Sequence, residues 1–182
     1  MEQYSFKSIT IKTMIIHTIS YFCMGVLAFF LMDYTALFAE PVMRNYMRPI
    51  DHPMIAAGTM VQVLRGFLFG LVFYSLRETV FARPRGWLTL WLVLVVVGII
   101  STFAPAPGSV EGLVYTQIPL WQHLKGMPEI LLQALLLAFL SHYWINHPKK
   151  KWLNWTFWMV FILALLMSLA GFVTRIMMKV PV

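Results

Sequence analysis

Long apolar runs, each near 20 residues, constrain this 182-residue chain more than any other feature. A helix needs about 20 apolar residues to cross a bilayer, and each of its backbone N–H and C=O groups must be satisfied within that helix. Charged residues make up only 12% of the chain, which is about half the share usual in a soluble domain. The sequence therefore predicts an all-α integral membrane protein. The runs lie at about 13–32, 54–76, 87–104, 128–146 and 152–174.

These runs predict a single transmembrane helical domain over 1–182, a bundle of five helices within a range of four to six. Proline and glycine separate the runs. Two connections, 33–53 and 105–127, are long, and both fall on the outer side of a five-helix chain. Because 105–127 is itself apolar, we expect it to fold back onto the bundle as a lid, an interfacial turn or an ordered cap. The third run has no polar face, so we expect it to contact lipid the most.

Lysine and arginine residues are unequally divided between the two sides. Counted on alternate sides of five helices, eight lie on the side of the N-terminus and five on the other. The positive-inside rule then predicts a multi-pass protein of the inner (plasma) membrane, with a cytoplasmic N-terminus and an outside C-terminus. The eight are Lys7, Lys12, Arg77, Arg83, Arg85, Lys149, Lys150 and Lys151, and the five are Arg44, Arg48, Lys125, Arg175 and Lys179. The net charge of +7 thus reflects topology, and the expected partner is the lipid bilayer, with no nucleic acid.

Arg65 is the residue most out of place, because it stands at the centre of the second run with eleven uncharged residues on each side. Such a position costs about 2.5–3.5 kcal/mol, so the side chain is expected to face a protein interior or a wet cavity. Helical periodicity puts Gly58, Gln62, Gly66 and Gly70 on the same side as Arg65. Two interpretations remain open. The face either packs small residues against another helix or subunit, or it lines a site for a carboxylate or phosphate.

Other runs supply polar partners for this face. His17 lies on a polar stripe of the first run, and Glu129 and Gln133 lie one turn apart in the fourth. Glu129 is the expected counter-charge of Arg65, with Asp33 and Asp51 in reserve. The expected ligand-binding residues are therefore Arg65, Gln62, Gln133, Glu129 and His17. The fifth run carries a stripe of small and polar residues, namely Ala164, Ser168, Gly171 and Arg175.

Acidic residues and histidines gather on the predicted outer side. The resulting polar cluster comprises Asp33, Asp51, His52, Glu111 and His123. Its members offer general acid and base groups that could act on a lipid-like substrate. No known catalytic motif accompanies them, so the sequence assigns no catalytic residues and favours a protein without enzymatic activity. The spacing of histidines and of the single cysteine predicts no metal site.

A cofactor provides a further alternative. His17 and His142 lie in different runs at similar depth, and two such histidines on separate helices are able to hold a b-type haem.

The leading prediction is a membrane protein that binds or transports a small anionic or amphiphilic molecule through a polar interior centred on Arg65. It would act alone as a homo-oligomer or as a subunit of a membrane complex. The alternatives are a membrane-embedded enzyme acting on a lipid-like substrate at the outer face, a structural subunit, and a haem- or quinone-binding helical protein.

Overall fold

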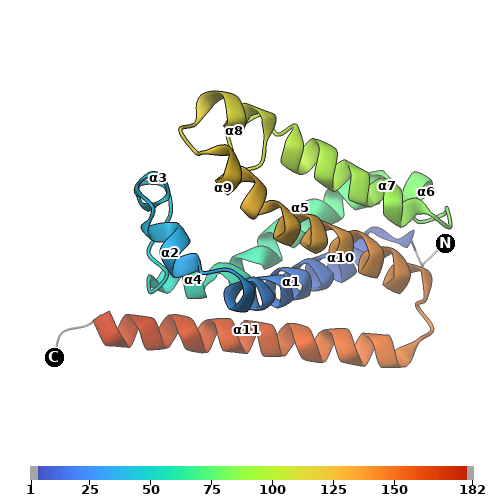
Figure 1. The fold of residues 1–182 in the computed structure, drawn as a ribbon. Coiled ribbons are helices and arrows are strands. Elements are labelled where there is room, and N and C mark those ends of the chain that lie inside the picture. Colours follow the sequence, from blue (N-terminus) through green and yellow to red (C-terminus); the bar gives the residue numbers. More distant parts are fainter. Residues whose placement is uncertain (1–3, 180–182) are drawn as a thin grey trace.

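The computed structural model describes residues 4–179, and every regular element in this range is helical (Figure 1). The predicted all-α class is therefore confirmed. The elements are α1 (Phe6–Leu31), α2 (Tyr34–Ala39), α3 (Pro41–Arg44), α4 (Pro53–Ala56), α5 (Gly58–Ser75), α6 (Arg77–Val80), α7 (Gly86–Leu92), the π-helix η2 (Val93–Ile100), α8 (Val110–Tyr115), α9 (Leu120–Lys125), α10 (Met127–Asn146) and α11 (Lys151–Lys179).

Four helices in the described range are long and apolar enough to cross a membrane. They are Phe6–Leu31, Gly58–Ser75, Leu120–Asn146 and Lys151–Met178. The third predicted span, 87–104, forms the shorter apolar helix Gly86–Ile100 instead. This helix ends early because the Ser101 N–H bonds back to the Val96 carbonyl at 2.8 Å, and the chain then leads into Pro105, before which extended backbone is favoured.

The ends of the other spans differ modestly from prediction. α1 begins at Phe6, well before residue 13, because the Ser5 hydroxyl caps it by accepting a hydrogen bond from the Ser8 N–H at 3.3 Å. The predicted run 54–76 is divided at Ala57 into α4 and α5. Element type thus followed from apolarity, whereas boundaries followed from local capping.

The chain passes back and forth between two ends of the bundle (Figure 1). We call the end where α1 begins the N-end; it also holds α6 and the connection from α10 to α11. The opposite end, which we call the loop end, holds α2 to α4, α8 and α9. α7 and η2 carry the chain from the N-end back toward the loop end, so α11 finishes at the end opposite to the start of α1. The two chain ends themselves lie outside the described residues.

α1 is the central helix, and two glycines let α5 approach it closely. A Cβ atom added to Gly66 would lie 2.7 Å from the Met14 Cα, and one added to Gly70 would lie 2.8 Å from the Thr10 Cα. Both neighbours are backbone atoms, which side-chain rotation cannot move aside. The two glycines therefore serve close packing of α5 on α1.

α11 is fastened to the loop end by the stripe predicted from the sequence. The Ser168 hydroxyl donates to the Ala56 carbonyl, and the Arg175 guanidinium donates to the carbonyls of Ile50 at 2.8 Å and His52 at 3.3 Å. Elsewhere α11 is largely exposed, and it is the least buried of the four long helices. The third run, expected to contact lipid the most, buries Leu90 and Leu94 in the core, whereas α11 leaves most of its surface exposed.

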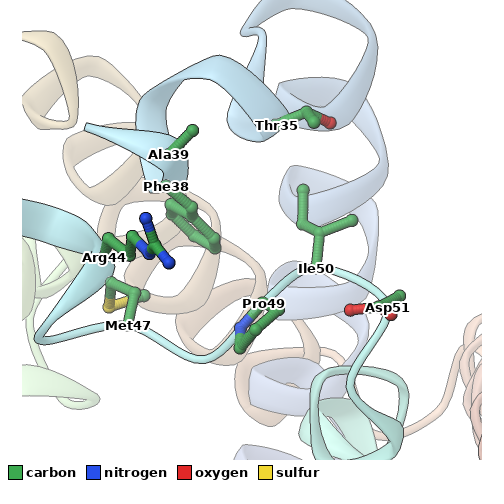
Figure 2. A pocket seen from close by; sticks show the side chains of 8 residues that line it. All are labelled: Thr35, Phe38, Ala39, Arg44, Met47, Pro49, Ile50 and Asp51. Atoms are coloured by element: carbon green, nitrogen blue, oxygen red, sulfur yellow. The ribbon is translucent and has the colours of Figure 1, made fainter. Parts of the chain in front are cut away.

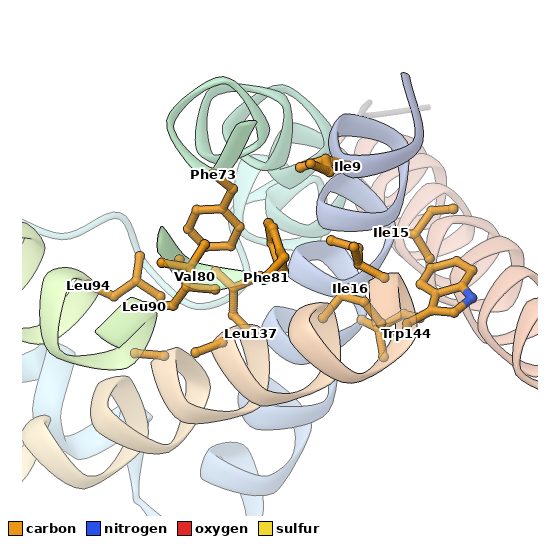
Figure 3. Packing of buried hydrophobic residues seen from close by; sticks show 14 of the residues in the cluster. Ile9, Ile15, Ile16, Phe73, Val80, Phe81, Leu90, Leu94, Leu137 and Trp144 are labelled. Carbon is orange, nitrogen blue, oxygen red and sulfur yellow. The ribbon is translucent and has the colours of Figure 1, made fainter. Parts of the chain in front are cut away.

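The apolar core lies between α1, α5, α7 and α10, and several of its side chains are completely covered (Figure 3). Figure 3 shows Phe73 and Phe81 beside Val80, with Leu90 to the left and Leu137 of α10 beneath them. The rings of Phe73 and Phe81 meet edge to face, with their centres 6.4 Å apart. This core holds α7 against α10 even though α7 and η2 are short.

The two long connections contain short helices with their own caps. Asp33 accepts from the Ala36 N–H at 3.0 Å to begin α2, and the buried Ser109 hydroxyl accepts from the Gly112 N–H at 2.9 Å to begin α8. The apolar side chains of α8 and α9 are nevertheless mostly exposed, Val114 and Trp121 among them. The connection 105–127 is thus an ordered cap, but it does not bury its apolar residues on the bundle as expected.

Candidate functional site

Arg65 lies on the exposed flank of α5, next to the glycine face and not within it. Its guanidinium sits 5.4 Å from the centre of the Phe69 ring in a cation–π contact, and it interacts electrostatically with His17 and Tyr21 of α1. Among residues 4–179 it makes no hydrogen bond or ion pair. This placement differs from the predicted interior, because α1 approaches α5 too closely at Gly66 for an arginine to lie between them.

The polar interior is occupied by His17 and Gln62 instead. The His17 side chain is only 1% exposed, and its Nε2 lies 3.0 Å from the Gln62 Oε1. Since the Gln62 amide nitrogen donates to the Gly58 carbonyl at 3.2 Å, the Oε1 atom is the acceptor and His17 Nε2 carries the proton. The Nδ1 atom of His17 is buried and has no hydrogen-bond partner in the described part of the chain. This pair joins α1 to α5 beside Arg65.

Glu129 lies in the same region as Arg65, but its hydrogen-bond partner is Tyr34. The Tyr34 hydroxyl donates a hydrogen bond to the Glu129 carboxylate. Burial, followed by this hydrogen bond, raises the pKa of the Tyr34 phenol, so that it remains protonated as the donor. Glu129 and Arg65 both lie near enough to Tyr21 to act on it electrostatically. Among the described residues the expected Arg65–Glu129 ion pair does not form.

We call this group the Arg65 cluster; it consists of His17, Tyr21, Tyr34, Gln62, Arg65 and Glu129. Four of these residues are among the five that the sequence predicted for ligand binding. Gln133, the fifth, is half-buried one turn beyond Glu129 on α10, and among residues 4–179 it makes no side-chain hydrogen bond. Sequence reasoning missed Tyr34 because it follows the first apolar run, where no periodicity links it to α10.

The predicted outer cluster separates into local roles. Asp33 caps α2, and the His52 Nδ1 caps α4 by accepting from the Met54 N–H at 3.1 Å. His123 is buried, and its Nδ1 accepts from the Gly108 N–H at 2.9 Å. Glu111 lies in the first turn of α8. In the described range no three His, Cys, Asp or Glu side chains are close enough together to hold a metal ion.

Asp51 lines a pocket of about 410 Å³ at the loop end (Figure 2). Figure 2 shows Arg44 and Asp51 at different parts of the rim, with Phe38, Met47 and Ile50 supplying apolar surface between them. Arg44 had no role in the sequence prediction beyond its charge. The pocket thus combines one charge of each sign with mainly apolar walls.

The two histidines considered for haem both have protein partners. His17 Nε2 faces Gln62, and His142 Nε2 lies 3.0 Å from the Arg83 carbonyl oxygen. The His142 ring also stacks on Phe81 with ring centres 6.1 Å apart. A haem iron would have to displace these contacts to be ligated through either Nε2 atom.

Comparison with protein-family models, curated proteins and solved structures finds no match for this chain. The fold and the site therefore place the chain in a broad structural class, without assigning it to a protein family. The chain is an all-helical protein with four helices suited by length and apolarity to crossing a membrane, and with a polar cluster between α1, α5 and α10.

Proposed function

We propose that this is a multi-pass protein of the inner membrane that binds or passes a small anionic or amphiphilic molecule at the Arg65 cluster. Arg65 would be the anion ligand, and the protein would work as an oligomer or as a subunit of a membrane complex. The observation that carries the proposal is the exposed guanidinium of Arg65 midway along an apolar helix, without hydrogen bonds to the described residues.

Lipid tails cannot satisfy that guanidinium. Leaving it in hydrocarbon costs about 2.5–3.5 kcal/mol, and the contact with Phe69 offsets only part of this cost. A carboxylate or phosphate matches the planar fork of arginine donors and neutralises its charge. The polar side chains beside it, His17 and Tyr21, would extend the recognition of a polar headgroup, while the exposed Leu64 and Leu68 suit an apolar tail. An amphiphilic anion therefore satisfies both parts of this surface.

The first test uses the protein purified in non-ionic detergent, with decanoate as the amphiphilic probe and inorganic phosphate as the polar one. Decanoate is expected to raise the unfolding temperature of the wild type in a saturable manner. Arg65→Ala should weaken this binding by about ten-fold or more, since a hydrogen bond to a charged group contributes about 1.5–3 kcal/mol. Arg85→Ala, which removes an exposed arginine at the N-end, is the control and should bind as the wild type does.

Two outcomes would contradict the ligand role. If the wild type and Arg65→Ala bind decanoate equally, Arg65 is not part of the binding site. If Arg65→Ala instead changes the size of the oligomer in light scattering, the residue serves contacts between subunits, as the structural alternative requires. A membrane enzyme at the outer face receives less support, because the His52 Nδ1 caps α4 and the His123 Nδ1 accepts a hydrogen bond from the Gly108 N–H.

The orientation can be tested separately. Because α7 and η2 return the chain to the loop end despite their length, we expect five passes, with the N-end cytoplasmic and the loop end outside (Figure 1). A reporter fused after Val182 is expected to read as external, and one inserted at 147–150 as cytoplasmic. A cytoplasmic reading after Val182 would show that Gly86–Ile100 does not cross the membrane.

A further inference from the structure

A second pocket, of about 390 Å³, lies at the N-end of the bundle, far along α1 from the loop end. It is bounded by the first turns of α1, the end of α10 and the beginning of α11. Among the residues that the structure describes, its charged lining residues are Lys7 and Lys12, and none of its lining residues is a carboxylate. The pocket therefore carries two positive charges that no described residue of its wall neutralises.

Lys12 is held in place by the pocket wall. Its Nζ donates to the Trp144 carbonyl at 3.2 Å and lies 5.4 Å from the centre of the Trp144 ring. The Trp144 indole is itself fixed, because its Nε1 donates to the Asn154 Oδ1 at 2.7 Å. An ammonium group has three donors, and one carbonyl engages only one of them. Lys12 is thus a half-buried, oriented cation with donors to spare.

The neighbouring groups suit a phosphate. Ser5, Ser8 and Lys12 recur at helical spacing and line the same pocket, and Lys7 extends its rim. The Ser5 hydroxyl accepts from the Ser8 N–H, which leaves its own proton free to be donated. Two ammonium groups and serine hydroxyls together provide the donors that a phosphate oxygen needs.

The remaining wall indicates a lipid. Ile11, Trp144 and Trp158 give the pocket an apolar side. Along the adjoining part of α11, three tryptophans are exposed: Trp152, Trp155 and Trp158. Tryptophan concentrates at the level of lipid headgroups, so the pocket opens where a phospholipid would present its phosphate above its acyl chains. Basic pockets between helices at this level suit anionic headgroups.

We propose that this pocket binds the headgroup phosphate of an anionic phospholipid, with Lys7 and Lys12 as its charge partners and Trp158 against the acyl chain. The site lies at the opposite end of the bundle from the 410 Å³ pocket. It does not depend on the ligand proposed for Arg65.

The experiment measures lipid binding to the full-length protein in non-ionic detergent, by native mass spectrometry and thermal unfolding. Phosphatidylglycerol and phosphatidylcholine with identical acyl chains are compared with inorganic phosphate. We expect phosphatidylglycerol to bind at a concentration about ten-fold or more below phosphatidylcholine. The Lys7→Gln/Lys12→Gln variant should lose this preference.

The matched control is Lys149→Gln/Lys151→Gln, which removes the same charge from exposed positions at the same end. It should keep the preference for phosphatidylglycerol, as should Lys12→Arg. Lys7→Gln alone changes an exposed position. We expect it to reduce the preference for phosphatidylglycerol only partly and to leave Trp144 undisturbed. Loss of the preference in the control, its absence in the wild type, or equal stabilisation by inorganic phosphate would each overturn the proposal.

Discussion

Replacing Gly66 and Gly70 by alanine is expected to force α5 away from α1 and to destabilise the fold by about 1–3 kcal/mol at each site. The new Cβ atoms would lie 2.7 and 2.8 Å from backbone Cα atoms of α1, so relief requires movement of a whole helix. That movement would also lengthen the 3.0 Å contact between His17 and Gln62. Thermal unfolding of the purified protein measures the loss.

Two other glycines provide the controls. Gly25 in α1 and Gly98 in η2 have nothing within 4 Å of an added Cβ. Alanine at either position should be neutral or stabilising, because alanine is favoured over glycine in a helix by about 1 kcal/mol. If all four substitutions had the same effect, helix propensity and not close packing would explain it.

Gln62→Leu is expected to cost about 1–3 kcal/mol, because it leaves both ring nitrogens of the buried His17 without a partner. The double variant His17→Leu/Gln62→Leu should recover much of this loss, since removing both polar groups leaves nothing unsatisfied. The coupling free energy between the two positions is obtained from a double-mutant cycle of reversible unfolding in detergent.

Gln133→Leu is the matched control, because this glutamine is half-buried on α10 and makes no side-chain hydrogen bond within residues 4–179. Its effect should be well below that of Gln62→Leu. If the losses of the two single variants at 17 and 62 simply added, the hydrogen bond between them would contribute nothing to stability.

The Arg65 cluster shows where sequence reasoning succeeded. Helical periodicity placed Gln62 and the glycines on one side of the second run, and the structure packs that side on α1. A polar stripe containing His17 was found by the same spacing. Such predictions are local, because the position of a residue on a helix follows from 3.6 residues per turn alone.

The partners of these residues did not follow from spacing. Tyr34, and not Arg65, is the partner of Glu129, and it lies 95 residues away in the chain. Arg65 was expected inside the bundle because of its charge, yet the close approach at Gly66 leaves it on the flank of α5. Which face of a helix is covered depends on the helices that pack against it. The residue pattern of one helix does not identify those neighbours.

By itself, the sequence determined that the chain is helical and rich in segments suited to crossing a membrane, because long apolar runs leave the backbone few other ways to satisfy its hydrogen bonds. It predicted five such segments, and four helices in the described range are long enough. Only the tertiary structure decided that the third run ends at Ile100, that His17 meets Gln62, and that Lys7 and Lys12 share a pocket with Trp158. These features arise where separate helices pack together, and packing depends on the shapes of both surfaces at once.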